Sequence, residues 1–517
     1  MKRRNFLASA ATLPFALRNT PVHVASSPLF GALGATESDR VLVLINLIGG
    51  NDGLNTLVPL DQYDKLAQLR ANVIVPEGSL VDVDGLRAFH PAFAKMRDLW
   101  QAGELGMVQD VGYPDQNRSH FRSQDIWNTA SASDEVLTTG WIGRYLDGEY
   151  PNFPDGYPNT ETPDPVAVTL GNAISETCQG VMGNFGLTVN NPSNAGTIRD
   201  TAGGPPPATP YGDELTFVRE AIAQANAYGQ VVSAAADRGD NLVDYPADSK
   251  FAEQLSYVAK MISGGLATKV YVVSLGGFDT HANQVESGDT TAGEHAALLR
   301  TLAEGVAAFQ ADIKALGLGE RVIGMTYSEF GRRIRSNAAR GTDHGTAAPA
   351  FLFGECVNAA VLGANPDIDL GVDEQEGVAM QYNFRDLYGS VLENWFGVAP
   401  ATIRALLYDG YTRLPVIRDC SGVISDLAEA PDDDAAFHAA PSPFVDAVRL
   451  TFSLRARGPV RLEAYDMRGA RLETLFERRL PAGEQSVNVD ARDYPRGPVI
   501  FRLQEGGRVR VLRTVRL

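Results

Sequence analysis

The long N-terminal part of the chain alternates between continuous apolar runs and segments with apolar residues at three- and four-residue spacing. The apolar runs predict strands buried on both faces, because a half-exposed strand would alternate apolar and polar residues. These runs are 41–47, 105–111, 270–275 and 322–327. Between the last two runs, one face of a predicted helix carries Leu298, Leu302, Val306, Phe309 and Ile313. A strand, helix, strand unit predicts a right-handed crossover between parallel strands.

Further helices are predicted over 215–236, 251–262 and 386–395, and the segments 151–165 and 191–212, rich in Pro, Asn and Gly, are expected to be surface loops. The 517 residues exceed the size at which one hydrophobic core stops growing, so at least two domains are expected. The pattern therefore predicts an α/β fold with a mainly parallel sheet and at least one further domain.

Polar clusters follow each predicted strand, where open α/β sheets bind their ligands. The clusters are 49–53 with Asp52, 117–121 with Arg118, Ser119 and His120, 276–281 with Asp279 and His281, and 328–332 with Glu329. A further cluster with Asp343 and His344 precedes the apolar segment 347–353. Carboxylates and imidazoles brought to one edge by several strands are the usual components of a metal site.

Each of these residues also has a purely structural interpretation. Asp52 lies among glycines, where a turn residue is common, and Ser119 is placed where a helix cap would be. His281 can be a hydrogen-bonded partner, and Glu329 can pair with a neighbouring arginine. Asp343 and His344 have fewer structural interpretations, because a turn between glycines needs no imidazole.

The composition narrows the classes of partner. A formal net charge of -18 opposes general binding to nucleic acid or to anionic lipid. The three cysteines, Cys178, Cys356 and Cys420, exclude a disulfide framework and have no paired metal-binding spacing, although one disulfide can form. No segment after the N-terminus is apolar enough to span a membrane, so we expect no transmembrane anchor.

The N-terminus has the pattern of an export signal. Arg3 and Arg4 precede the weakly apolar stretch from Leu7 to Leu17, as in twin-arginine signals. That stretch is shorter than the about 20 residues that a membrane span needs, and Pro14 interrupts it. We therefore expect residues 1–35 to be a signal peptide read by the twin-arginine machinery, which exports folded proteins. An ordinary secretory signal is the alternative.

The C-terminal part differs in charge from the rest. From Arg455 to Leu517 there are 14 arginines, no lysine and 8 acidic residues, in an otherwise acidic chain. Before it, residues 421–443 contain three consecutive aspartates and little apolar surface, which predicts a linker. Alternating apolar and polar residues between turn signals then predict a small antiparallel β-sandwich over 444–517.

The motifs in the strand-end clusters resemble a known bacterial family, domain of unknown function 1501. The resemblance covers about residues 38–415 and rests on five runs: 47–56, 112–114 with 118–121, 276–284, 328–332 and 341–346. The family belongs with the alkaline phosphatase and sulfatase-like superfamily, and its members commonly carry twin-arginine signals. The resemblance implies an alkaline-phosphatase-like α/β/α sandwich with one or two divalent metals and a Ser, Thr or modified Cys nucleophile.

The resemblance also suggests a role for each candidate residue. The expected metal ligands are Asp52, Asp279, His281, Glu329, Asp343 and His344. The expected catalytic residues are Ser119 as nucleophile with Arg118 and His120 beside it; Arg118 or Arg122 would hold the phosphoryl or sulfuryl oxygens. The metal is expected to be Zn²⁺, with Mn²⁺, Mg²⁺ and Ca²⁺ as alternatives. Where active members of the superfamily place Asp-His, this chain has Ser328-Glu329.

Two functions remain open at this point. The first is hydrolysis of an unidentified phosphate or sulfate ester, and phosphate is favoured because no Cys/Ser-x-Pro-x-Arg motif lies near Ser119. The second is a degenerate hydrolase fold that acts as a surface or assembly protein.

The pattern of 462–503 is similar to the C-terminal sorting domain of type IX secretion cargo. This resemblance implies the type IX machinery as a partner, and a route through the periplasm to the cell surface or outside. A plain immunoglobulin-like spacer or binding module is the alternative.

Overall fold

The computed structural model divides the chain into two compact units, Met1–Cys420 and Ser421–Leu517. It describes residues 39–195, 198, 204–418 and 420 of the first unit, and residues 437–440, 444–454, 458–466, 471–481, 483–505 and 508–516 of the second. Two dipeptides, β1 (Ala16–Leu17) and β2 (Thr20–Pro21), are also described and pair antiparallel. The rest of the expected signal lies outside the described residues, so the signal stays a prediction.

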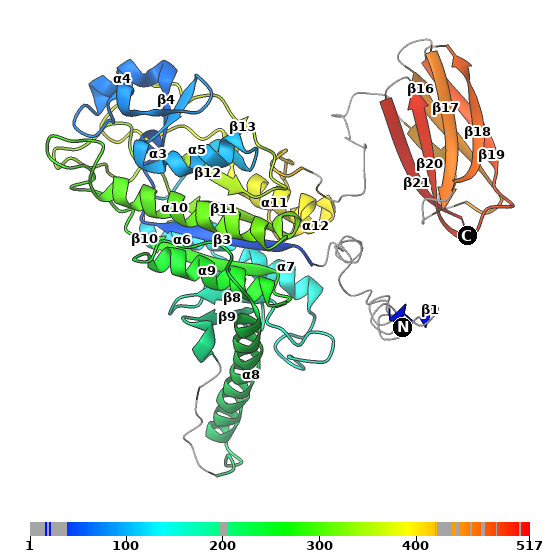
Figure 1. Ribbon diagram of the computed structural model, residues 1–517, viewed down its shortest axis with the longest axis horizontal. Coiled ribbons are helices and arrows are strands. Elements are labelled where there is room, and N and C mark those ends of the chain that lie inside the picture. Colours follow the sequence, from blue (N-terminus) through cyan, green and yellow to red (C-terminus); the bar gives the residue numbers. More distant parts are fainter. Residues whose placement is uncertain are drawn as a thin grey trace. The chain divides into compact units, whose positions relative to one another are not determined.

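A nine-stranded sheet forms the centre of the first unit (Figure 1). Its path runs in the order β13-β7-β12-β11-β3-β10-β8-β9, and β14 pairs with β7. The strands are β3 (Val41–Ile48), β7 (Leu105–Gly112), β8 (Ala167–Leu170), β9 (Gly186–Val189), β10 (Val270–Gly276), β11 (Val322–Ser328), β12 (Ala348–Phe353), β13 (Val361–Leu362) and β14 (Tyr382–Asn383). All pairings are parallel except those of β12, which runs antiparallel to both β11 and β7. The four strands expected from apolar runs are present, and a mainly parallel sheet is confirmed.

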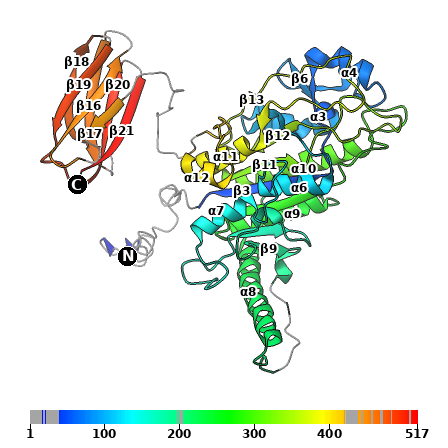
Figure 2. The same ribbon diagram turned by 180° about the vertical axis from the view of Figure 1, so that it is seen from behind.

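Helices cover both faces of this sheet. They are α5 (Ala94–Gln101), α6 (His120–Thr129), α7 (Trp141–Glu149), α8 (Pro210–Arg238), α9 (Lys250–Ser263), α10 (Glu294–Ala315), α11 (Phe384–Asn394) and α12 (Pro400–Leu406). Helices α9 and α10 are in front in Figure 1, and α6, α11 and α12 are seen from the other side in Figure 2. Helix α8 projects from the unit in both views. The sequence pattern predicted α8, α9, α10 and α11 and did not predict α5, α6, α7 or α12.

The side chains of β3 show why a continuous apolar run was needed. Val41, Val43 and Ile45 are buried in the core that includes α9 and α10, whereas Leu42 and Leu44 are buried in the core that includes α6, α7 and α11. Successive side chains of a strand point to opposite faces, so a strand between two helical layers has no solvent-facing side. The α/β/α layering therefore follows directly from this strand's composition.

Smaller elements complete the first unit. They are a three-stranded sheet of β4 (Leu57–Pro59), β6 (Arg87–Phe89) and β5 (Val81–Asp82), the helices α3 (Gly53–Thr56) and α4 (Tyr63–Leu69), and the 3-10 turns Leu60–Gln62, Glu77–Ser79, Pro91–Phe93, Glu176–Cys178, Pro192–Asn194 and Gly319–Arg321. A disulfide joins Cys356 to Cys420 and ties the end of the unit to the segment after β12. Cys178 is free and buried. Among the described residues, no helix has the length and apolarity to cross a membrane.

The second unit contains two antiparallel sheets. One has the order β15-β16-β19 and the other β18-β17-β20-β21. Their strands are β15 (Phe437–Ala440), β16 (Ala447–Leu454), β17 (Gly458–Asp466), β18 (Arg471–Leu480), β19 (Gly483–Asp490), β20 (Gly497–Glu505) and β21 (Arg508–Arg516). Leu450 and Phe452 of one sheet share a core with Leu462 and Phe501 of the other, as in a β-sandwich. The predicted C-terminal sheets are confirmed.

The linker expected over 421–443 is too long at its C-terminal end. Residues Phe437–Ala440 form β15 and pair with β16, and the ring of Phe437 contacts that of Phe452 at 6.0 Å between centroids. An apolar aromatic residue gives this short segment surface to bury, which the acidic residues before it lack. The remainder of the expected linker lies outside the described residues.

Candidate metal centre

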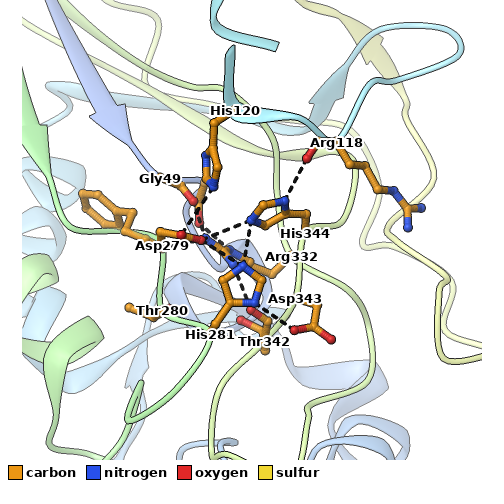
Figure 3. Close-up of polar contacts among 12 residues, drawn as sticks. Gly49, Arg118, His120, Asp279, Thr280, His281, Arg332, Thr342, Asp343 and His344 are labelled. Atoms are coloured by element: carbon orange, nitrogen blue, oxygen red, sulfur yellow. Dashed lines mark hydrogen bonds and ion pairs between the residues drawn. The ribbon is translucent and has the colours of Figure 1, made fainter. Parts of the chain in front are cut away.

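Three histidines and one aspartate meet at the edge of the sheet where the parallel strands end (Figure 3). His120 is the first residue of α6, and Asp279 and His281 follow β10. His344 lies in the loop before β12. Because β12 is antiparallel to its neighbours, the segment before it reaches the same edge as the segments after the parallel strands. The strand that breaks the parallel order therefore completes the site.

The ligand atoms of these four residues lie close together. His120 Nε2 is 3.3 Å from Asp279 Oδ2, and Asp279 Oδ1 is 3.1 Å from His281 Nε2 and 3.2 Å from His344 Nε2. The two last nitrogens are 2.8 Å apart. Ligand atoms around a tetrahedral zinc ion are about 3.3 Å apart, given zinc–nitrogen distances of about 2.0–2.1 Å. These four separations, 2.8–3.3 Å, are close to that value.

The second nitrogen of each imidazole faces an oxygen that can only accept a hydrogen bond. His120 Nδ1 is 2.9 Å from Glu329 Oε2, His281 Nδ1 is 2.9 Å from Asp343 Oδ1, and His344 Nδ1 is 2.8 Å from the carbonyl oxygen of Arg118. A carboxylate or carbonyl oxygen accepts, so each Nδ1 carries the proton and donates it. In the neutral ring, each Nε2 then has a free lone pair.

With all three rings neutral, three Nε2 lone pairs and the carboxylate of Asp279 lie close together with no proton between them. This arrangement is repulsive unless a cation lies at the centre, and histidine ligands of metals have the same pattern of an Nδ1–H donated to an oxygen behind the ring. His120, Asp279 and His344 also form a group whose ligand atoms all lie within 4.8 Å of one another. The donor set of three imidazole nitrogens and one carboxylate fits a divalent ion, with zinc first.

The four side chains are partly open to solvent, with exposed fractions from 21% for His344 to 45% for Asp279. Buried neighbours nevertheless fix the orientation of these side chains. The buried ring of Phe330 lies 4.5 Å from the ring of His344 and 5.1 Å from that of His120, between centroids. Gly49 contributes by having no side chain, because a Cβ there would lie 2.3 Å from the backbone nitrogen of Asp279, and its φ is +118°.

Arg332 is a residue of the site that the sequence pattern did not single out. Its guanidinium is fully buried and donates to the carbonyls of Gly49, Gly50, Phe278 and Thr342 and to Asp279 Oδ1. These acceptors belong to three loops: the one after β3, the one after β10 and the one before β12. Arg332 therefore joins three of the segments that build the centre and orients Asp279. Its position at the end of the cluster 328–332 was the only available signal.

Two predicted ligands stand behind the centre and not in it. Glu329 is buried and accepts hydrogen bonds from His120 Nδ1, from the backbone nitrogen of Gly49 and from Gln124 Nε2. Asp343 accepts from His281 Nδ1 and Asn337 Nδ2 and pairs with Arg333. In this geometry the oxygens of both carboxylates accept hydrogen bonds that orient the imidazoles, and direct binding of the metal by either one stays a prediction.

Asp52, a further predicted ligand, lies in a buried ion pair. Its side chain is fully buried and forms an ion pair with Arg70 at 2.6 Å, and Gln284 Nε2 donates to the same oxygen at 2.6 Å. Burial would raise the pKa of Asp52, but Arg70, His295 and Gln284 hold that pKa below its usual value. Arg70 therefore balances the charge of this carboxylate, while its other oxygen, Oδ1, has no hydrogen-bond partner among the described residues, so binding of the metal by Asp52 stays a prediction.

The residues predicted to be catalytic have three different positions. His120, expected beside the nucleophile, is instead one of the four candidate ligands. Arg118 turns its guanidinium away, as Figure 3 shows, and donates to the carbonyl of Gln375 at 2.6 Å, so the prediction that it holds substrate oxygens is not supported. Ser119 is the N-cap of α6, with an exposed side chain that makes no capping hydrogen bond. Its hydroxyl is free to react, and its role stays a prediction.

The charges around the centre favour the protonation states that bind a cation. Burial would raise the pKa values of Asp279 and Asp343, but other contacts hold both pKa values below their usual range: the hydrogen bond and charge of Arg332 for Asp279, and the hydrogen bond of His281 with the charge of Arg333 for Asp343. Burial lowers the pKa of His344. At neutral pH the carboxylates are charged and His344 is neutral, which are the forms that bind a metal.

The fold and the site together define an α/β protein with a candidate divalent-metal centre at the carboxyl edge of its sheet. The chain belongs to the family described as "Protein of unknown function (DUF1501)", whose model matches residues 100–395. The matched range contains all four candidate ligands, and the family resemblance is confirmed. No curated protein matches the chain.

The chain shows a distant similarity to several solved structures. A protein in the alkaline phosphatase superfamily from Vibrio parahaemolyticus is 11% identical, with a TM-score of 0.32, covering 84% of this chain and 82% of its own. A phosphonate monoester hydrolase from Silicibacter pomeroyi is 10% identical at a TM-score of 0.32, covering 92% and 89%. A sulfatase from a Pseudoalteromonas species is 11% identical at 0.31, covering 90% and 86%. Similarity this distant carries no activity across.

Proposed function

We propose that this protein is a metal-dependent hydrolase of phosphate esters, with sulfate esters as the less favoured substrates. The observation that carries the proposal is the convergence of His120, His281, His344 and Asp279, with each Nδ1 already committed to an acceptor behind it. Those four side chains would hold a divalent cation, Zn²⁺ first. When bound, such an ion supplies Lewis-acid stabilisation of negative charge on an ester oxygen.

The exposure of the site supports a catalytic role over a structural one. Asp279 and His281 are more than 40% exposed, whereas structural zinc sites are closed by their protein ligands. Ser119 precedes His120 and presents a solvent-exposed hydroxyl. We propose Ser119 as the nucleophile: its Oγ forms a bond to phosphorus as the alcohol leaves, and water then releases phosphate and regenerates the hydroxyl.

The start of α6 gives the substrate's negative charge a place near these groups. The first backbone N–H groups of a helix have no partner within it and carry a partial positive charge. In α6 they begin at His120, next to the candidate ion. Phosphate oxygens placed there would be bound by backbone donors as well as by the cation.

A specific observation favours the second candidate function, a non-catalytic protein that uses the ion for structure. The guanidinium groups nearest the centre are engaged by the protein: Arg118 by Gln375, Arg122 by the carbonyls of residues 132, 133 and 135, and Arg332 and Arg333 by the contacts described above. Four protein ligands also suffice to complete a tetrahedral zinc shell. A surface or assembly protein built on this fold would have these properties.

Metal content and turnover together separate the two functions. We expect the purified chain, freed of metal and reloaded, to hold about one zinc ion and to hydrolyse p-nitrophenyl phosphate faster than p-nitrophenyl sulfate. His281→Ala should lose both the ion and the activity, and Ser119→Ala should keep the ion and lose the activity. Asp367→Asn, at an almost fully exposed carboxylate, is the matched control. A tightly bound ion with no turnover of either ester favours the structural role, and no bound metal refutes both.

We also propose the route of this protein through the cell: twin-arginine export to the periplasm, then delivery by type IX machinery to the surface or outside. Two observations support this route: the Arg3-Arg4 pattern, and the sandwich of the second unit, whose sequence pattern is similar to that of a sorting domain. The truncation described in the Discussion tests this route.

A further inference from the structure

An open pocket of about 480 Å³ borders the segments that carry the metal ligands. Its lining residues are Asn283, Val285, Glu286, Ser287, Gly293, Glu294, Ala297 and Arg340. This volume falls in the range of about 300–1,000 Å³ that is usual for small-molecule sites. None of the predicted site residues is among those that line it.

Backbone hydrogen bonds fix this pocket relative to the metal centre. Asn283 N donates to Ala339 O at 3.1 Å, Gln284 N to Arg340 O at 3.0 Å, and Thr342 N to Thr280 O at 3.2 Å. These bonds join the segment of Asp279 and His281 to the segment of Asp343 and His344. Asn283 follows His281 by two residues, a span of about 7 Å of extended chain. One wall of the pocket therefore belongs to the loop that carries His281.

The pocket has features that packing alone does not require. Asn283 and Arg340 both have left-handed backbones, with φ of 54° and 55°, and Arg340 Nη2 donates to Asn283 Oδ1 at 2.9 Å. Non-glycine residues held in this region concentrate at functional sites. Among the described residues, nothing accepts a hydrogen bond from the buried Nε of Arg340.

The opposite wall is a loop with fixed ends. Gly293 has a φ of +123°, and a Cβ there would lie 2.6 Å from Val285 Cα, so only glycine lets the chain return this close before α10 begins. At the tip of the loop, Thr290 Oγ1 donates to Ile74 O at 2.7 Å. The wall is therefore built into the fold.

The lining residues select one chemical class. Glu286 and Glu294 offer only acceptors at neutral pH, Arg340 offers only donors, and Asn283 and Ser287 offer both. A hydroxyl group donates and accepts, so a ring or chain with several hydroxyls can satisfy all of these side chains. A second anionic group would face two carboxylates, whereas Val285 and Ala297 can pack against the C–H groups of such a ring or chain.

We propose that this pocket binds the hydroxyl-rich part of the substrate, a sugar or another polyol that carries the ester group. The proposal rests on the proposed hydrolase function and names the class of alcohol that the enzyme releases. The pocket positions that alcohol while its ester group lies at the candidate ion.

The test fills the pocket without touching the centre. Ala297 is exposed on α10 and lines the pocket, so Ala297→Trp occupies it, and Glu304→Trp, at an exposed position two turns further along α10, is the matched control. With zinc-loaded full-length protein, we expect Ala297→Trp to raise the KM for glucose 6-phosphate at least about tenfold. The kcat/KM for p-nitrophenyl phosphate should change less than twofold, and the control should match the unmodified chain for both esters.

A second measurement needs no hydrolysis. Saturation-transfer NMR with maltose, cellobiose and lactose should detect binding of at least one to the unmodified chain and the control, and should lose it in Ala297→Trp. If no ester is hydrolysed but this loss is seen, the hydrolase function fails and the polyol pocket stands. If none of the three sugars binds, or if Ala297→Trp with normal zinc content binds and hydrolyses as the control does, the pocket proposal is overturned.

Discussion

Replacement of Arg332 by lysine tests whether one buried side chain holds the centre together. The guanidinium donates to Gly50 O at 2.7 Å, Thr342 O at 2.8 Å and Phe278 O at 2.9 Å, and also to Gly49 O and Asp279 Oδ1. A lysine keeps the charge, but its three donors lie on one atom at the end of a narrower chain. It cannot reach acceptors on three loops at once.

The loss of stability in Arg332→Lys can be estimated from the carbonyl groups that lose their hydrogen-bond donor. A buried polar group left without a partner costs about 1–3 kcal/mol. At least two carbonyls lose theirs, and the side chain is fully buried. We therefore expect Arg332→Lys to lower the free energy of unfolding of the metal-free protein by about 3–5 kcal/mol. Because Asp279 is no longer oriented, zinc affinity should fall by about 10–100-fold.

Urea denaturation in chelator gives the first quantity, and competition with a zinc-binding dye gives the second. The control is Arg335→Lys, a nearby, partly exposed arginine whose guanidinium donates to the carbonyls of Val372 and Leu370. It should change stability by less than about 1 kcal/mol and leave zinc affinity unchanged. If Arg332→Lys behaves like this control in both measurements, the idea that Arg332 organises the site is refuted.

Three further outcomes are expected. His344→Ala should lower zinc content and the melting temperature of the zinc-loaded protein together, and should leave the melting temperature in chelator nearly unchanged, because the ion stabilises only the folded chain. Burial raises the pKa of Asp110 to about 6, above its ordinary 3.8, so this group makes folding less favourable as pH rises from about 4 to 7. Asp110→Asn should therefore gain roughly 2–3 kcal/mol over the unmodified chain at pH 7 and little at pH 4; an equal difference at both pH values would contradict this cause. A chain that ends at Cys420 keeps the Cys356–Cys420 disulfide and should fold and bind zinc, yet remain in the periplasm when native-host cells are fractionated; arrival at the surface would exclude a sorting role for the second unit.

The sequence by itself determined the frame of the molecule. The run 41–47 is apolar at every position but one, and a strand of that kind needs helices on both faces, which the structure shows. The helical face of 298–313 lies between two such runs, so the parallel unit β10-α10-β11 could be predicted from local spacing alone. Asp279, His281 and His344 were found for a similar reason: polar residues directly after or before a buried strand must lie at the edge of the sheet.

Only the tertiary structure decided what each polar residue does at that edge. Glu329 and Asp279 both follow a strand in the sequence, but one orients His120 from behind and the other faces the centre. That difference depends on the direction of a side chain and on which imidazole lies opposite, neither of which local spacing records. The pairing of Asp52 with Arg70, and the single buried guanidinium that joins three loops, likewise depend on contacts between segments far apart in the chain. Periodicity reports which face of an element is buried, whereas the partner of a buried charge is set by the packing of the whole unit.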